Sequence, residues 1–120
     1  MSKILLVEDD LFLRTLYVDL LKGAKYDVDF AVDGDEAFNK ITSTKWDLIL
    51  LDVIIPKMKG PEVIERLKKE NPKLLKLKIV FLTNLDKQSE TPETNTQGYE
   101  VILKSDLNPD EFLKKVKSYL

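Results

Sequence analysis

Polar side chains that could do chemistry stand at the ends of four short apolar runs in this chain. The first two runs end in carboxylates, the third in a hydroxyl and the fourth in an amine: Glu8 with Asp9, Asp52, Thr83 and Lys104. Oxygen ligands of this kind suit a hard divalent cation, and an ammonium and a hydroxyl can stabilise phosphoryl oxygens. A carboxylate beside such a cation can also attack phosphorus and form an acyl phosphate. The pattern therefore indicates phosphoryl-transfer chemistry, provided that the fold brings these residues together.

The four apolar runs have the composition of buried strands. They cover residues 4–7, 48–51, 79–82 and 101–103 and consist mainly of branched residues. Strands covered on both faces are continuous apolar runs, as in parallel sheets. In an open α/β sheet, ligands bind in the crevice at the carboxyl ends of the strands. We therefore expect the polar residues that follow these runs to meet at one sheet edge.

Helical periodicity predicts four helices, over about residues 10–22, 34–42, 61–70 and 109–120. Asp10, Asp33 and Asn108 suit N-caps, and Gly23 suits a C-cap. The apolar face of the first helix is predicted to comprise Leu13, Leu16, Tyr17, Leu20 and Leu21. That of the last helix is predicted to comprise Phe112, Leu113, Val116, Tyr119 and Leu120.

Two further segments differ from the buried strands. Val28, Phe30 and Val32 alternate with polar or small residues, which predicts a half-exposed strand at a sheet edge. Residues 85–98 contain one leucine and a central Pro92, so they predict only a weak or irregular helix.

The alternation of strands and helices predicts an α/β fold with a five-stranded parallel sheet, because short helical crossovers require parallel strands. A flavodoxin-like, doubly wound order 2-1-3-4-5 puts the alternating strand at an edge and the first and third strands side by side. This order would bring Glu8, Asp9 and Asp10 next to Asp52. With no linker in the sequence, we expect residues 1–120 to form a single domain.

Composition excludes several classes of function. The chain has 120 residues with 19 basic and 21 acidic side chains, a net charge of −2 that gives no support for nucleic-acid binding. It contains no cysteine and no histidine, which excludes disulfides, thiolate sites and histidine-based catalysis. No apolar run is long enough for a membrane span, and an early acid, Glu8, is unlike a signal peptide. We therefore expect a cytoplasmic protein.

The sequence resembles the receiver domain of two-component response regulators, in the single-domain form typical of chemotaxis regulators. Residues 4–10 are similar to the family's first strand and acidic pair, here Glu8 and Asp9. Asp52, followed by Pro56 and Gly60, is similar to the family's phosphoacceptor loop. Thr83 and Lys104 match the hydroxyl residue and the lysine of the family pattern.

This resemblance implies a phosphorylation-dependent signalling switch. Asp52 would accept a phosphoryl group from a histidine kinase or a histidine phosphotransfer protein, assisted by Thr83 and Lys104. It also implies Mg²⁺ or Mn²⁺ held by Glu8 (through water), Asp9, Asp52 and the backbone carbonyl of Ile54. Such a protein would signal to a downstream protein and would not turn over an external substrate.

The chain departs from the family pattern at Ser105, where a proline is usual, and at Val101, where an aromatic residue is usual. Three alternatives stay open at this point. The chain could be an interaction module that works without phosphorylation, or a receiver taken from a longer transcription factor. It could also be a metal-dependent phosphatase, but the residue where such enzymes carry a general acid is Ile54.

Overall fold

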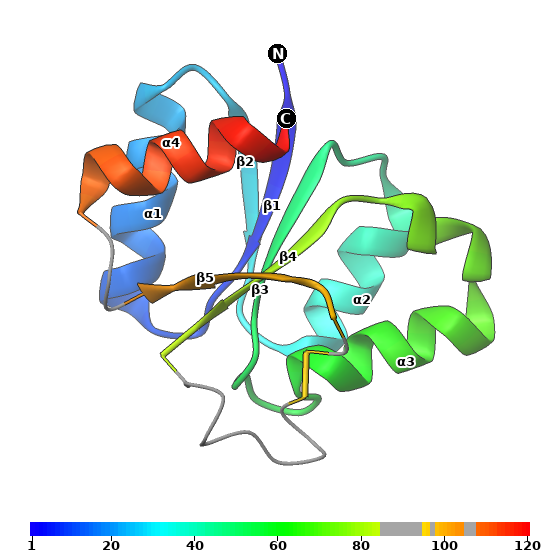
Figure 1. Cartoon of the computed structure of the whole chain (residues 1–120). Coiled ribbons are helices and arrows are strands. Elements are labelled where there is room, and N and C mark those ends of the chain that lie inside the picture. Colours follow the sequence, from blue (N-terminus) through cyan, green and yellow to red (C-terminus); the bar gives the residue numbers. More distant parts are fainter. Residues whose placement is uncertain (85–94, 97, 105–107) are drawn as a thin grey trace.

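A five-stranded sheet flanked by helices forms the centre of the computed structural model, which describes residues 1–84, 95, 96, 98–104 and 108–120 (Figure 1). The strands are β1 (Lys3–Val7), β2 (Asp27–Ala31), β3 (Leu48–Asp52), β4 (Ile79–Thr83) and β5 (Glu100–Leu103). The helices are α1 (Leu11–Gly23), α2 (Gly34–Ser43), α3 (Gly60–Glu70), a 3₁₀ helix η1 (Pro72–Lys76) and α4 (Pro109–Tyr119). From β1 to β4 strands and helices alternate, as the sequence predicts.

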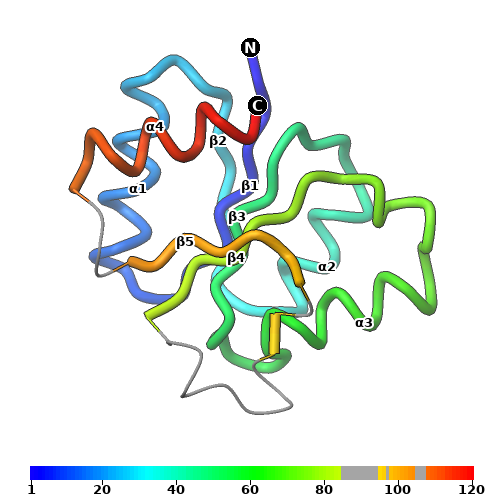
Figure 2. The backbone as a smooth tube through the Cα atoms, in the orientation of Figure 1, coloured from blue at the N-terminus to red at the C-terminus, as the bar shows by residue number. Residues whose placement is uncertain are grey.

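The strands are all parallel and follow the order β2-β1-β3-β4-β5, which confirms the flavodoxin-like prediction. β2 is an edge strand, as its alternation predicts. β1 lies between β2 and β3, with Val7 opposite both Ala31 and Leu51. Figure 2 shows the chain leaving β1, β3 and β4 towards the same lower part of the molecule. The carboxyl ends of the central strands therefore share one edge of the sheet.

Successive residues of β1 pack on opposite faces of the sheet. Ile4 and Leu6 belong to an apolar cluster with residues of α1 and α4, whereas Leu5 and Val7 belong to one with residues of α2 and α3. β3 is buried over its whole length. Since both faces of these strands are covered, their sequences are continuous apolar runs and not alternating ones.

Side-chain caps begin three of the helices. Asp10 caps α1, Asp33 caps α2 and Asn108 caps α4. Each accepts a hydrogen bond from the backbone N–H three residues later, at 2.8–2.9 Å. These caps satisfy donors that the first helical turn leaves unpaired, which is why the three predictions hold.

The end of α1 differs from its prediction by one residue. Gly23 is still helical and the C-cap is Ala24, whose N–H donates to the carbonyls of Leu20 and Leu21. The left-handed conformation falls on Lys25, with φ of 73°. In the turn that leads into β2, the residue with positive φ is therefore Lys25, two residues after Gly23.

Some residues predicted to face the core are instead exposed. Leu16 is 38% exposed and Leu120 is 45% exposed, because α1 buries a narrower stripe than predicted and Leu120 follows the last turn of α4. Phe30 is 39% exposed while its neighbour Ala31 is fully buried. On the edge strand β2, only Ala31 at its carboxyl end is buried, and the rest of the strand is exposed or half-exposed.

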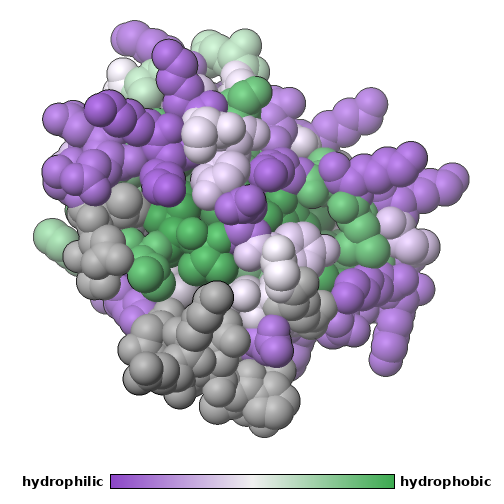
Figure 3. Space-filling view, in the orientation of Figure 1, coloured by the Kyte–Doolittle hydropathy of each residue, from purple (hydrophilic) through white to green (hydrophobic). Residues whose placement is uncertain are grey.

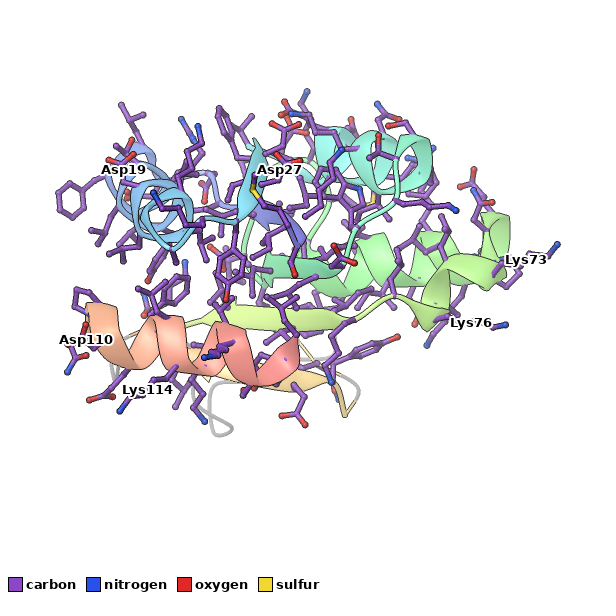
Figure 4. The ribbon with its side chains drawn as sticks, turned by 90° about the horizontal axis from the view of Figure 1, so that it is seen from above. Asp19, Asp27, Lys73, Lys76, Asp110 and Lys114 are labelled. Carbon is purple, nitrogen blue, oxygen red and sulfur yellow. The ribbon has the colours of Figure 1, made fainter. Side chains whose placement is uncertain are left out.

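The predicted weak helix at residues 85–98 falls mostly outside the described residues, and Ser105 lies outside them too. On the described surface, Figure 3 shows hydrophilic residues over α4 and apolar residues in the middle of this face. Figure 4 shows Lys73 and Lys76 projecting outward from η1. In the described part of the chain, no helix combines the length and apolarity that crossing a membrane requires.

Candidate functional site

Three acidic residues meet at the carboxyl ends of β1 and β3. Glu8 and Asp9 follow β1, and Asp52 is the last residue of β3, its pairing partner. Each offers one carboxylate oxygen such that the three oxygens lie within 4.8 Å of one another. Glu8 is 1% exposed and Asp52 is 6% exposed, whereas Asp9 is open to solvent. The sheet order thus brings together acids from distant parts of the sequence.

Lys104 completes this cluster from β5. Its ammonium nitrogen donates to Asp52 Oδ2 at 2.7 Å and also bonds Glu8 Oε1. All three side chains are buried, with 8% or less of each exposed. Lys104 follows β5 directly and therefore reaches across the end of β4 to its two partners.

The charges in the cluster shift the protonation of its members. Burial raises the pKa of Glu8; the Lys104 ammonium opposes this shift and the Asp52 carboxylate adds to it. Burial acts to lower the pKa of Lys104, but its bonds to Asp52 and Glu8 outweigh burial, so that this pKa is raised. Three carboxylates face one ammonium, which leaves an excess of negative charge where a cation could bind.

Thr83 ends β4, between the strands that carry Asp52 and Lys104. It is 3% exposed and pairs with Leu103, the residue before Lys104. Thr83 therefore lies at the same end of the sheet as the acidic cluster. All five polar residues that the sequence places at strand ends thus lie at one edge. The carboxylate of Asp10 is not part of the acidic cluster and caps α1, while its backbone N–H donates to Glu8 Oε2 at 3.3 Å.

The loop after Asp52 is held tightly against α2. The N–H of Ile54 donates to Asp52 Oδ1 at 3.2 Å, and the carbonyl of Pro56 accepts from the N–H of Gly34 at 3.0 Å. A Cβ atom at Gly34 would lie 2.3 Å from the Cβ of Met58, so only glycine fits there. Asp33 and Lys57 form an ion pair of 3.5 Å across the same contact.

Gly60 closes the other end of this loop. Its N–H donates to the carbonyl of Val53 at 2.9 Å, and a Cβ there would lie 2.6 Å from the carbonyl oxygen of Asp52. The glycine spacing after Asp52 therefore has a steric reason, because the start of α3 passes directly over the backbone of the acidic residue.

Arg14 is a residue of the site region that sequence reasoning missed. Its Nη1 donates to the carbonyl oxygens of Glu8 at 3.2 Å and of Asp9 at 3.3 Å. Its signal in the sequence is a charged side chain beside the apolar stripe of α1, one turn after the acids. The contacts of Gly34 were missed as well, since its partner Met58 is remote in sequence.

The donor set fits a hard divalent cation. Carboxylate oxygens are preferred ligands of Mg²⁺ and Mn²⁺, and histidine and cysteine, which softer metals favour, do not occur in this chain. Glu8, Asp9 and Asp52 could hold such an ion at the mouth of the cluster, where Asp9 is open to water. Mg²⁺ usually retains several waters, and a partly open site of this kind allows that.

Comparison with known protein families agrees with this geometry. The family described as response regulator receiver domain matches residues 4–117, nearly the whole chain. The chain belongs to the response regulator receiver domain family. This membership confirms the resemblance seen in the sequence, and it identifies a signalling domain of two-component systems and not an enzyme that turns over a substrate.

Relatives of this receiver domain include transcriptional regulators. The alkaline phosphatase synthesis transcriptional regulatory protein PhoP of Bacillus subtilis is 35% identical over 119 residues, which cover 99% of this chain and 48% of PhoP. The chain spans about half the length of the curated relatives that it matches first.

Solved structures show the same fold. The chemotaxis response regulator CheY4 of Vibrio cholerae is 29% identical with a TM-score of 0.85, covering 100% of this chain and 99% of that chain. The response regulator TrrA of Thermotoga maritima, in complex with Mg²⁺ and BeF, is 32% identical with a TM-score of 0.79, covering both chains fully. TrrA has also been solved in complex with the histidine kinase ThkA.

Proposed function

We propose that this protein is a phosphorylation-dependent signalling switch that accepts a phosphoryl group on Asp52, and that residues 1–120 act as one receiver domain. The observation that carries the proposal is the position of Asp52: its carboxylate is buried, 2.7 Å from an ammonium and close to two further acids. This arrangement of an ammonium and further acids around a buried carboxylate suits a nucleophile, because the phosphorylated product carries additional negative charge that the ammonium and a bound cation can stabilise.

In this proposal an Asp52 oxygen attacks phosphorus and the bond to the donor's leaving group breaks, so that an acyl phosphate forms. Mg²⁺ held by Glu8 (through water), Asp9, Asp52 and the Ile54 carbonyl would offset the charge of the phosphoryl oxygens. Lys104 moves its ammonium from Asp52 to a phosphoryl oxygen, and the Thr83 hydroxyl donates to another. Each group thus has a role that its position permits.

The donor is proposed to be a phosphohistidine on a histidine kinase or phosphotransfer protein. TrrA, which is similar to this chain over its full length, is solved in complex with a histidine kinase. These 120 residues contain no histidine, so they cannot themselves be the phosphohistidine donor. The phosphorylated form would then signal to a downstream protein, and the domain would assist its own phosphorylation and dephosphorylation.

The proposal is tested by incubating the protein with acetyl phosphate and Mg²⁺ and measuring its intact mass. We expect the wild-type protein to gain one phosphoryl group, and Asp52→Asn to gain none because an amide is not nucleophilic. Asp19→Asn is the matched control: Asp19 lies exposed on α1 and its replacement should leave labelling unchanged (Figure 4). Labelling of Asp52→Asn at the wild-type level would refute the assignment. A wild-type protein that is never labelled would favour an interaction module that works without phosphorylation.

A further inference from the structure

The guanidinium of Arg14 bridges the two acidic residues that follow β1. Arg14 lies in the first turns of α1, and its Nη1 reaches back to the carbonyl oxygens of Glu8 and Asp9, at 3.2 and 3.3 Å. Both carbonyls belong to residues whose side-chain oxygens form the acidic cluster. One side chain therefore touches the backbone of two candidate metal ligands without touching their carboxylates.

Arg14 is itself supported by an aromatic ring. Its guanidinium lies 5.0 Å from the ring centroid of Phe30 on β2. The backbone of Phe30 is fixed in turn, because its N–H donates to Asp29 Oδ1 at 2.8 Å and its carbonyl accepts from Lys40 Nζ at 2.6 Å. This explains why a large apolar residue stands partly exposed on the edge strand: the ring gives the guanidinium a surface to stack on.

Few other hydrogen bonds hold the backbone between β1 and α1: within it, the N–H of Asp10 donates to Glu8 Oε2 at 3.3 Å. The N–H of Glu8 donates to the carbonyl of Ala31 at 3.0 Å, and Asp10 caps α1. Between these points lie the two peptide groups whose carbonyls Arg14 binds. Hydrogen bonds from a charged donor are stronger than neutral ones, so they restrict how these peptides can rotate. Their orientation sets the direction in which the side chains of Glu8 and Asp9 leave the backbone, and Lys104 additionally holds the Glu8 carboxylate.

We infer that Arg14 is a positioning residue for the metal site: by binding the backbone carbonyls of Glu8 and Asp9, and resting on Phe30, it holds both carboxylates ready for Mg²⁺. This inference rests on the proposed function, because it concerns the same ion.

The direction in which the Mg²⁺ affinity changes when Arg14 is replaced distinguishes a positioning role from a purely electrostatic one. A fixed positive charge near the site repels Mg²⁺, so removing it would strengthen Mg²⁺ binding if electrostatics alone acted. Positioning has the opposite consequence, because ligands that are free to rotate must be ordered when the ion binds. Replacement of groups that orient metal ligands typically weakens metal affinity about tenfold or more.

The experiment is calorimetric titration of the metal-free protein with Mg²⁺ in the wild type, Arg14→Gln and Arg66→Gln. Arg66 on α3 is a matched control, since its guanidinium also stacks on a phenylalanine, 3.9 Å from the ring centroid of Phe38, away from the acidic cluster. Each change removes one positive charge and one stacked guanidinium. We expect Arg14→Gln to bind Mg²⁺ about tenfold more weakly and Arg66→Gln to bind it as the wild type does.

Phe30→Leu tests the same inference with the charge of Arg14 kept. It should also weaken Mg²⁺ binding, and metal-free thermal unfolding identifies any variant that fails to fold. If Arg14→Gln folds and binds Mg²⁺ as strongly as the wild type or more strongly, the positioning role of Arg14 is wrong. If Arg14→Gln does not fold, unchanged Mg²⁺ binding by Phe30→Leu leads to the same conclusion. Either result leaves the metal site of the proposed function intact. A wild-type protein that binds no Mg²⁺ would instead overturn the metal site of the proposed function, and this inference with it.

Discussion

Lys104 Nζ lies 2.7 Å from Asp52 Oδ2, so the side chain proposed to sense the phosphoryl group is already bound to the residue proposed to carry it. The same ammonium bonds Glu8, which joins the ends of β5, β3 and β1 around one buried charge. Lys104 is therefore a counter-ion of the acids before any phosphoryl group arrives. The sequence-based expectation described only its later role.

Replacing Lys104 by alanine is expected to destabilise the metal-free protein, because two buried carboxylates lose their shared cation. Breaking a buried ion pair on one side typically costs about 3 kcal/mol in the free energy of unfolding. Mg²⁺ should restore much of this loss, so the variant's melting temperature should rise more with Mg²⁺ than that of the wild type. Thermal unfolding with and without Mg²⁺ measures both effects, and exposed Lys45→Ala is the control. An equal response of the wild type and Lys104→Ala to Mg²⁺ would contradict the counter-ion role.

Asp9 and Glu8 should separate metal binding from folding. Asp9 is exposed, so Asp9→Asn should weaken Mg²⁺ binding by removing an anionic ligand while leaving metal-free stability nearly unchanged. Glu8 is 1% exposed and bonded to Lys104, so Glu8→Gln should alter both quantities. Mg²⁺ titration and urea unfolding without metal would show the difference. If a variant carrying both Glu8→Gln and Asp9→Asn binds Mg²⁺ with wild-type affinity, these residues are not ligands of the ion.

Gly34 should tolerate no side chain. A Cβ there would lie 2.3 Å from the Cβ and 2.4 Å from the carbonyl oxygen of Met58, so Gly34→Ala must displace the loop after Asp52. Overpacking of this kind costs about 2 kcal/mol. Gly23 is the matched control, because nothing lies within 4 Å of its Cβ position and Gly23→Ala should stabilise α1 by about 0.5 kcal/mol. Urea unfolding of both variants measures these changes. If Gly34→Ala and Gly23→Ala are equally stable, the predicted steric clash at Gly34 is wrong.

Asp33 should contribute a pH-dependent part of the stability. The backbone N–H of Glu36 holds the pKa of Asp33 below its usual value, and the Lys57 ammonium lowers it further. The contribution is therefore fully present above the pKa of an unfolded aspartate, about 3.9, and is lost as pH falls through the lower pKa of the folded state.

The variant Asp33→Asn keeps an oxygen that can cap α2 but cannot titrate. Its deficit relative to the wild type should be largest near neutral pH and should shrink below about pH 4. Asp33→Ala loses the cap itself and should be less stable by about 1 kcal/mol at neutral pH. Urea unfolding over a pH series measures both, and a deficit of Asp33→Asn that does not change with pH would argue against the charged cap.

Much of the fold follows from local pattern. The continuous apolar run 48–51 predicts a strand covered on both faces, and the alternation around Phe30 predicts an edge strand. Both features agree with the flavodoxin-like order that the structure shows. The apolar run 101–103 is an exception: its composition predicts burial on both faces, but β5 is the other edge strand and Leu103 is 36% exposed, because no strand in the described part of the chain covers its outer side. The caps Asp10, Asp33 and Asn108 are equally local, since each bonds a donor three residues away.

The sequence predicts which residues belong to the candidate site, but not which of them contact one another. Acids, a hydroxyl and an amine at strand ends must meet at one sheet edge once the strands are parallel. Which of them touch was decided by the tertiary structure: Lys104 bonds residues 96 and 52 positions away, and its long side chain reaches past β4 to do so. Arg14 and Gly34 belong to the same category, because their partners are backbone atoms brought near by the register of strands and loops. Pattern records which faces are buried, whereas such contacts depend on distances between elements, and those are set only when the whole sheet and its helices pack together.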